Sequence, residues 1–413
     1  MRVVISCAFN ENAIWALSRH ASSHGLLTQR LVPAWDLAST AGRRVGAVLG
    51  WDAATRFAER KGAKVAASHL PEDVEISRVT ELIRIAGARV RTPVTPLLGQ
   101  YAWKAQFDRR VGRVLRTDGT DVVIGMPGSS LRTFARHPGP VRVFHAIDTH
   151  PRARNAALRQ AYGRRAWAET YPEVLSRRIE AELELADVVL VPSEVVRTGM
   201  VEHGVDPAKI ELVPYGVDLD RFRVDPGAVE RSPSTRPRLI CVGQISLRKG
   251  IPLLIEAVRG LDVQLSLVGQ VFDRGVVRDL PGNVDLLGAL SPADLARAYN
   301  RHDAMVLPTV DDACSLVVAE AAASGLRVVT TSANGAGELL PAGHVIVAPG
   351  DVVELRRVLS SLSVLDVDER RRISDEVRSL TGSRMRSWAG YAETVFASLV
   401  RRLRGSGAGP VVA

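Results

Sequence analysis

Cysteine is scarce in this sequence. Only Cys7, Cys241 and Cys314 occur among 413 residues. They lie far apart, form no Cys-x-x-Cys pair, and join no histidines at the spacing of a zinc site. We therefore expect neither a disulfide framework nor a structural zinc ion, and we place the protein in a reducing compartment.

Long apolar runs are also missing. No stretch approaches the roughly 18 residues that a membrane-spanning helix requires. The first residues, MRVVISCAFNEN, enter a strand-like run without a charged and apolar leader. The sequence thus predicts a cytoplasmic protein.

Aromatic residues make up only 5% of the chain, while the formal net charge is +9. Such a charge suits nucleic acid, an anionic membrane surface or a phosphorylated ligand. No basic stretch is interleaved with aromatics, which argues against nucleic acid as the partner. The arginines are scattered through helical stretches, so an ordinary solvated surface remains an alternative.

Short, β-branched apolar runs alternate with helical patterns along the whole chain. Continuous apolar strands are typical of parallel sheets buried on both faces, and their alternation with helices indicates βαβ units. The expected strands lie at residues 2–9, 121–126, 141–147, 187–193, 237–243, 263–269, 303–309 and 327–332.

The α/β pattern is interrupted once, at residues 223–236, which are rich in proline, serine and arginine and read as a linker. We expect a Rossmann-like domain on each side, at 1–222 and 237–380. A last helix at 381–404 follows, and we expect it to cross back to the first domain before a disordered tail at 405–413. Doubly wound sheets bind ligands at the carboxyl ends of their strands, so a cleft between the domains is the expected site.

The segment CVGQISLRKGIPLLIEAV suits an anion site. A strand ends at Gly243, a loop carries Arg248 and Lys249, and Gly250 opens an amphipathic helix. Cations beside the free N–H groups of a helix start favour phosphate binding. The loop lacks the ending of a Walker A motif. The alternative is a solvated loop that carries two cations.

The segment DDACSLVVAEAAASG sets two carboxylates, Asp312 and Glu320, at the start of a helix and inside it. Glu320 suits the vicinal hydroxyls of a ribose, and Asp312 suits hydroxyls beyond a diphosphate. The alternative is that Asp311 and Asp312 cap the helix and Glu320 is a surface residue. The first helical N–H groups have no intrahelical partner and could face a phosphate: those of Ser315, Leu316 and Val317.

Three ordered segments together resemble the retaining glycosyltransferases of family 4. They are VPSEVVRTGMVEHGVDPAKIELVPYGVDLDRF, the Arg-Lys-Gly loop and the segment that begins DDACSLVVAEAAASG. The resemblance covers about residues 185–345, whereas residues 10–140 match only loosely. It implies the GT-B fold, in which two Rossmann-like domains face a cleft.

The resemblance also implies roles for individual residues of the donor site. Lys249 would contact the donor diphosphate, and Glu320 would hold the nucleoside ribose. Asp312 would lie near the donor sugar, where the family usually has glutamate. The N–H groups of Ser315 and Leu316 would face the phosphate.

The family places a histidine near the reacting sugar, and the resemblance assigns it to His145, with His150 as a competitor. One donor cation is missing, because Gln244 stands where the family commonly has arginine, and Arg248 would compensate for it. Asp312 is one methylene shorter than glutamate, which shifts its reach by about 1.5 Å.

The family's Gly-rich loop after the first strand is replaced here by Asn10, Glu11 and Asn12. These residues could bind acceptor or sugar hydroxyls. They could also cap the helix that contains Trp15, and we favour the cap.

Together, the motifs and the resemblance predict a retaining, metal-independent glycosyltransferase. It would move a sugar from a nucleoside-diphosphate donor to a hydroxyl of a glycan, a lipid-linked sugar or a small molecule, without a cofactor. A lipid-linked acceptor would bring the basic chain to an anionic membrane. The alternatives are a phosphorylase or epimerase on the same fold, a non-catalytic nucleotide-sugar-binding scaffold subunit, and a nucleic-acid-binding protein.

Overall fold

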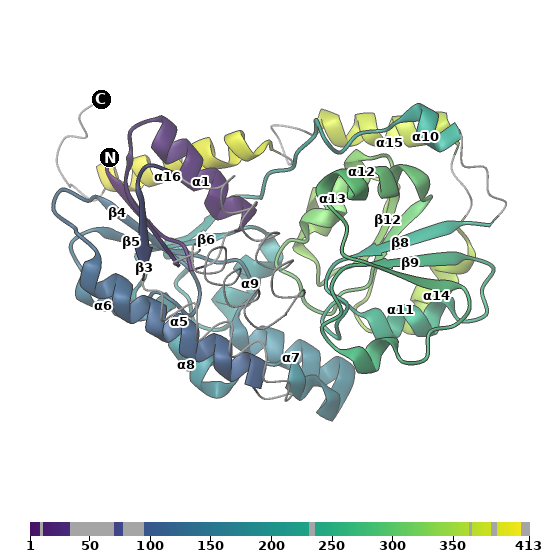
Figure 1. The fold of residues 1–413 in the computed structure, drawn as a ribbon, viewed down its shortest axis with the longest axis horizontal. Helices are drawn as coiled ribbons and strands as arrows, with labels where there is room; N and C mark the ends of the chain where they lie inside the picture. Colours follow the sequence, from purple (N-terminus) through teal and green to yellow (C-terminus); the bar gives the residue numbers. More distant parts are fainter. Residues whose placement is uncertain are drawn as a thin grey trace, which may run out of the picture.

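Two parallel α/β domains follow one another in the chain (Figure 1). The structure is a computed structural model. It describes residues 1–8, 11–33, 70–76, 95–230, 236–362, 366–380 and 386–405.

The first domain is built on a seven-stranded parallel sheet in the order β3-β2-β1-β4-β5-β6-β7. Its strands are β1 (Val3–Ser6), β2 (Leu27–Pro33), β3 (Asp73–Ile76), β4 (Val122–Gly125), β5 (Val141–His145), β6 (Val188–Val191) and β7 (Ile210–Leu212). Its helices are α1 (Asn12–Ser23), α5 (Thr95–Val114), α6 (Leu131–Arg136), α7 (Pro151–Tyr162), α8 (Glu173–Leu185) and α9 (Glu194–Glu202), with the 3-10 turns η2 (Gly163–Ala168) and η3 (Pro207–Lys209).

The second domain is built on a six-stranded parallel sheet in the order β10-β9-β8-β11-β12-β13. Its strands are β8 (Arg238–Val242), β9 (Gln264–Val268), β10 (Val284–Gly288), β11 (Ala304–Leu307), β12 (Arg327–Thr331) and β13 (Val345–Val347). Its helical segments are α11 (Ile251–Val258), α12 (Pro292–Arg301), α13 (Leu316–Ala323), α14 (Val352–Ser360), α15 (Val367–Ser379), η4 (Arg274–Val277) and η5 (Gly335–Leu339). A short helix, α10 (Pro226–Glu230), lies in the segment between the two sheets.

All eight strands expected from the sequence are present, and five others were missed. β3, β7, β10 and β13 are the four sheet edges. Acidic residues interrupt β3, β7 and β10, and β13 is only three residues long, so none of them shows a long apolar run like those of the central strands. The fifth, β2, carries Thr28, Gln29 and Arg30 in its middle, and Arg30 forms a buried ion pair with Asp73 of β3.

The last helix, α16 (Trp388–Gly405), packs on α1 of the first domain (Figure 1). The chain reaches it by a bridge between Arg386 and Gly216, just after the last strand of the first sheet. A Cβ on Gly216 would lie 2.6 Å from the backbone nitrogen of Trp388, so the two segments touch at their backbones.

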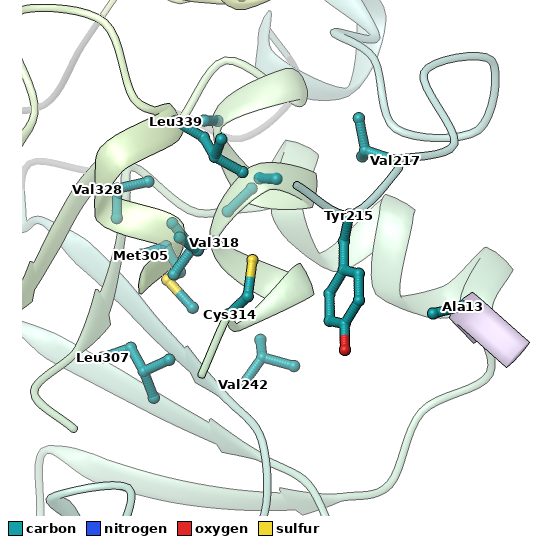
Figure 2. Packing of buried hydrophobic residues seen from close by; sticks show 14 of the residues in the cluster. Ala13, Tyr215, Val217, Val242, Met305, Leu307, Cys314, Val318, Val328 and Leu339 are labelled. Carbon is teal, nitrogen blue, oxygen red and sulfur yellow. The ribbon is translucent and has the colours of Figure 1, made fainter. Parts of the chain in front are cut away.

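One hydrophobic core runs through both domains. Tyr215 is buried between Ala13 of α1 and Cys314 of the second domain (Figure 2). A separate core lies between the first sheet and the helices α5, α6 and α8, and it includes Phe107, Phe134 and Leu175. Among the helices that the structure describes, none is both long and apolar enough to span a membrane.

Candidate functional site

The Arg-Lys-Gly loop is held against the end of β11 by a glycine. Gly250 has φ +71° and is the N-cap of α11. A Cβ at this position would lie 1.8 Å from the carbonyl oxygen of Pro308, an impossible separation. Only glycine therefore allows the loop before α11 to lie directly on the chain that leads into Asp311 and Asp312.

Lys249, Asp312 and Ser315 form one buried polar cluster. The Nζ atom of Lys249 pairs with the carboxylate of Asp312 and donates to Ser315 Oγ at 2.9 Å. Ser315 Oγ in turn donates to Asp312 Oδ2 at 2.6 Å. Burial lowers the pKa of Lys249, although Asp312 opposes this shift. Burial works to raise the pKa of Asp312, but Lys249 and Arg248 outweigh it and lower that pKa.

Arg248 lies beside this cluster. Its guanidinium donates to the carbonyl oxygen of Asp311 at 3.1 Å and lies 3.8 Å from the carboxylate of Asp312. The side chains of Arg248 and Lys249 are only 15% and 11% exposed, so the alternative of a solvated loop with two cations is wrong.

The helix-cap alternative for the acidic pair is also wrong. The N-cap of α13 is Ser315, and no side-chain cap bond is made there. The N–H of Ser315 donates to Asn334 Oδ1 at 3.2 Å and is therefore already engaged. For Leu316 and Val317, no hydrogen bond from the backbone N–H occurs within the described part of the chain, so these two groups keep their capacity to donate.

A second polar cluster comes from the first domain and was missed by sequence reasoning. Asp148 follows the carboxyl end of β5 and accepts from the hydroxyl of Tyr171 at 2.8 Å. Arg154 of α7 lies 3.5 Å from the same carboxylate and stacks over the Tyr171 ring. Asp148 is 28% exposed. Burial works to raise the pKa of Asp148, but Arg154, Arg248 and the Tyr171 hydrogen bond lower it overall.

Asp311 joins the two clusters across the domain interface. Its Oδ1 accepts from the Thr149 hydroxyl of the first domain at 2.5 Å. Its Oδ2 is buried without a hydrogen-bond partner in the described residues. Burial raises the pKa of Asp311, while Arg154 and Arg248 work to lower it. Asp311 Oδ2 therefore keeps unused acceptor capacity at this junction.

Glu11 and Lys104 extend the first-domain cluster. Glu11 is the N-cap residue of α1, yet its side chain makes no cap hydrogen bond, so the cap that we favoured from the sequence is wrong for this residue. Burial, with the nearby charge of Asp148, raises the pKa of Glu11 to about 7. Lys104 donates to the carbonyl oxygen of Pro127 at 3.0 Å, and burial lowers its pKa.

The two candidate histidines are both buried, in different surroundings. His145 Nε2 lies 2.8 Å from the hydroxyl of Tyr391 on α16, and burial lowers the pKa of His145 to about 4. His150 is the N-cap of α7 and stacks on His203 with ring centroids 4.4 Å apart. Burial and His203 lower its pKa to about 4. Both rings are neutral at pH 7.

The remaining predicted residues lie at the margins of these clusters. Glu320 is half-buried on α13, and burial raises its pKa to about 7, with the charge of Arg221 opposing the shift. Gln244 and Asn12 are exposed. Asn10 lies outside the described residues.

The two domains hold each other by two carboxylates, each bound to backbone N–H groups of the opposite domain. Glu169, which ends η2, accepts from the N–H groups of Leu247 and Arg248 at 2.6 and 2.9 Å. Glu338 of η5 accepts from Glu194 and Val195 at the start of α9, both at 2.9 Å. Glu169 is buried and holds the Arg-Lys-Gly loop, whereas Glu338 is exposed and does not touch it.

We expect Glu169→Gln to impair turnover more than stability alone explains. The amide keeps the shape of the side chain but replaces one charged acceptor with a donor that faces a backbone N–H. This change should lower the free energy of unfolding by about 1.5–3 kcal/mol. The loop that carries Arg248 then shifts, so kcat should fall by about tenfold or more. Glu338→Gln is the matched control, because it weakens the other carboxylate contact between the two domains. Steady-state kinetics and melting temperatures of both variants check this, and equal kcat losses would contradict it.

Comparison with known proteins matches two family models to successive parts of the chain. A family model described as "Glycosyltransferase Family 4" matches residues 54–221, and one described as "Glycosyl transferases group 1" matches residues 236–363. Together these ranges cover more than half of the chain. The chain belongs to glycosyltransferase family 4.

The curated relatives of this family 4 member are distant. The D-inositol 3-phosphate glycosyltransferase of Segniliparus rotundus is 29% identical over 267 residues, which is 58% of this chain and 58% of that one. The MMP alpha-(1->4)-mannosyltransferase of Mycolicibacterium hassiacum is 28% identical and covers 66% of this chain and 69% of the relative. The chain thus spans little more than half of the Segniliparus protein.

Solved structures establish the GT-B fold of the family 4 chain. Sucrose-phosphate synthase from Thermosynechococcus elongatus superposes with a TM-score of 0.71 at 16% identity, covering 98% of this chain and 100% of that one. Anabaena HepE, solved in complex with UDP and glucose, gives a TM-score of 0.65 at 14% identity, with 97% and 100% covered. At these identities the likeness concerns the fold.

Proposed function

We propose that the protein transfers a sugar from a nucleoside-diphosphate donor to an acceptor hydroxyl with retention of the anomeric configuration. The observation that carries the proposal is the buried pair of cations, Arg248 and Lys249, at the start of α13 and facing two acids. Bond breaking at the anomeric carbon leaves negative charge on the diphosphate. Fixed cations and free N–H groups in a water-poor site stabilise such charge strongly.

When the donor binds, Lys249 would exchange its contact with Asp312 for one with the donor diphosphate. In the structure Asp312 neutralises Lys249, and a donor diphosphate would compete with that carboxylate for the ammonium group. Asp312 would then be released to accept hydroxyls of the donor sugar. Glu320, one and a half turns into α13, would hold the ribose. We propose that this binding needs neither a metal ion nor a cofactor.

The acceptor would enter from the first domain. Asp148, Arg154 and Tyr171 offer acceptors and donors for a polyhydroxylated molecule, and Asp311 Oδ2 has acceptor capacity to spare. Retaining transfer by attack on the same face as the leaving group uses the departing phosphate oxygen as the base, so no protein nucleophile is required. We propose a glycan or a lipid-linked saccharide as acceptor. The names of the relatives support the reaction class, and UDP in HepE supports the donor class.

A thermal-shift titration with UDP, GDP, ADP and TDP and their sugar conjugates tests the donor site. A ligand at 100 times its Kd adds about 2.7 kcal/mol to the free energy of unfolding, which raises the melting temperature measurably. We expect one base to give this shift, and we expect Glu320→Ala to abolish most of it. Glu376→Ala, on the solvent-facing side of α15, is the control.

Three outcomes would count against the proposal. No shift with any nucleotide would contradict the donor site. A shift without turnover on any saccharide acceptor would favour a non-catalytic binding subunit. Stabilisation by inorganic phosphate together with turnover that needs no nucleotide would point to a phosphorylase.

A further inference from the structure

Three aspartates lie at the junction of the two domains, and Asp148 is the most accessible of them. Its side chain is 28% exposed, that of Asp312 is 9% exposed, and Asp311 is 5% exposed as a whole residue. Asp312 is also occupied by Lys249 and by the hydroxyl of Ser315. A ligand between the domains therefore finds the carboxylate of Asp148 more open to contact than the other two.

The backbone places Asp148 next to the contact between the domains. It follows the carboxyl end of β5, the edge at which parallel sheets bind their ligands. The next residue, Thr149, donates its hydroxyl to Asp311 Oδ1 at 2.5 Å. The carbonyl oxygen of Asp311 in turn accepts from the guanidinium of Arg248 at 3.1 Å. Asp148 thus belongs to the first domain but lies only one residue from a direct contact with the donor side.

The charge of Asp148 acts on the donor-side cation. Burial works to lower the pKa of Arg248, but Asp312, Asp148 and Asp311 outweigh it and raise that pKa. Asp148 is therefore within electrostatic reach of the guanidinium that would bind the donor diphosphate. A sugar attached to that diphosphate has to lie between Arg248 and the acceptor-side groups of the first domain. Asp148 occupies this position.

The two histidines near Asp148 in the sequence offer a sugar little surface. His145 and His150 are 1% and 2% exposed. The Nε2 atom of His145 lies 2.8 Å from the hydroxyl of Tyr391. The Nδ1 atom of His150 accepts from the N–H of Arg152 at 3.2 Å. Both rings are thus engaged inside the protein, whereas the carboxylate between them in the sequence reaches solvent.

We propose that Asp148 is a catalytic residue that accepts a hydroxyl hydrogen of the transferred sugar and stabilises the positive charge on its anomeric carbon. This inference rests on the proposed function. The bond from the anomeric carbon to the diphosphate oxygen breaks, and a bond from that carbon to the acceptor oxygen forms. The acceptor proton moves to the departing phosphate oxygen, so Asp148 neither gains nor loses a proton. A fixed negative charge beside the sugar stabilises the transition state more than the ground state.

The variant Asp148→Asn tests this role, because it keeps the shape of the side chain and removes its charge. The probes are the nucleoside diphosphate selected by the thermal-shift titration and its sugar conjugate, both measured by isothermal titration calorimetry. We expect the Kd of the conjugate to rise about tenfold or more, since a hydrogen bond to a charged group is lost. The Kd of the bare diphosphate should change less than twofold. Release of the diphosphate from the conjugate, with water as acceptor, should slow by about 100-fold.

Asp187→Asn is the matched control. Asp187 also pairs with an arginine of the first domain, Arg142, at 2.7 Å, and its side chain is 41% exposed. This variant should leave both Kd values and the release rate within twofold. Asp148→Glu keeps the charge and covers the case in which the amide variant does not fold. It should release the diphosphate faster than Asp148→Asn.

Several results would overturn the role of Asp148. Equal weakening of conjugate and diphosphate in Asp148→Asn would indicate a structural role, as would equal losses in the amide and glutamate variants. A higher KM for a saccharide acceptor at unchanged kcat would indicate that Asp148 only binds the acceptor. Failure of the unchanged protein to bind any nucleotide would contradict the donor site itself, and this inference with it. Normal binding without a selective loss in Asp148→Asn would overturn this inference alone.

Discussion

Replacing Lys249 with alanine should lower kcat by about 100-fold or more, because it removes a cation aimed at the charge that develops on the leaving diphosphate. The side chain is only 11% exposed and contacts both Asp312 and Ser315, so water cannot substitute for it easily. Initial rates at saturating donor give the effect. A variant that keeps more than about a tenth of the activity would contradict the role of Lys249.

The same substitution also leaves a buried acid without its main partner. Breaking a buried ion pair costs about 3–5 kcal/mol, so lost activity could reflect lost folding. The double variant Lys249→Ala, Asp312→Asn separates the two effects, because it removes the orphaned charge as well. We expect its melting temperature to recover while its kcat stays low. Lys209→Ala, which removes an ammonium group that donates to the carbonyl oxygen of Glu184 at 3.0 Å, is the charge control.

Gly250→Ala should be among the most destabilising single substitutions in the second domain. The new Cβ would overlap the carbonyl oxygen of Pro308 at 1.8 Å, and the residue would be forced to keep φ +71°. The left-handed conformation alone costs about 1–2 kcal/mol, and displacement of two backbone segments should bring the total above about 4 kcal/mol. Urea denaturation followed by circular dichroism measures this.

Gly260→Ala offers a control that isolates the steric part. Gly260 has φ +72°, nearly the value of Gly250, but a Cβ there meets nothing within 4 Å. We expect Gly260→Ala to lower the free energy of unfolding only by the cost of the left-handed backbone conformation, about 1–2 kcal/mol. If the two variants lose equal stability, contact with Pro308 is not what fixes the loop, and the close approach of the cation loop to the acidic pair needs another cause.

The sequence predicts the central strands and the donor-side motifs well, for a physical reason. Central strands of a parallel sheet are buried on both faces, so the sequence shows them as continuous apolar runs, whereas acidic residues interrupt edge strands such as β3 and β10. The sequence segments around Lys249 and Ser315 lie 66 residues apart, yet each follows a strand end of the same parallel sheet, and this placement brings them into contact.

The first-domain cluster could not be predicted in the same way. Asp148, Arg154 and Tyr171 come together through the packing of α7 and η2, and none of them lies in a motif with fixed spacing. The signal that could have found Asp148 is its place directly after β5, where parallel sheets present their ligand-binding groups. No sequence pattern indicates the contact made by Glu169, because its partners are backbone N–H groups that lie 78 and 79 residues further along the chain.

The position of α16 has a consequence for biosynthesis. This helix is made after the second sheet, yet Tyr391 bonds His145 and Phe396 stacks on His20, both in the domain made earlier. While the ribosome is still adding the second domain, the part of α1 that packs on α16 is exposed to solvent. A growing chain with such a surface is prone to aggregate or to recruit a chaperone, and the first domain is complete only after α16 has been made. Truncation ahead of Trp388 should therefore harm the amino-terminal half of the protein, although the deleted residues lie at the other end of the sequence.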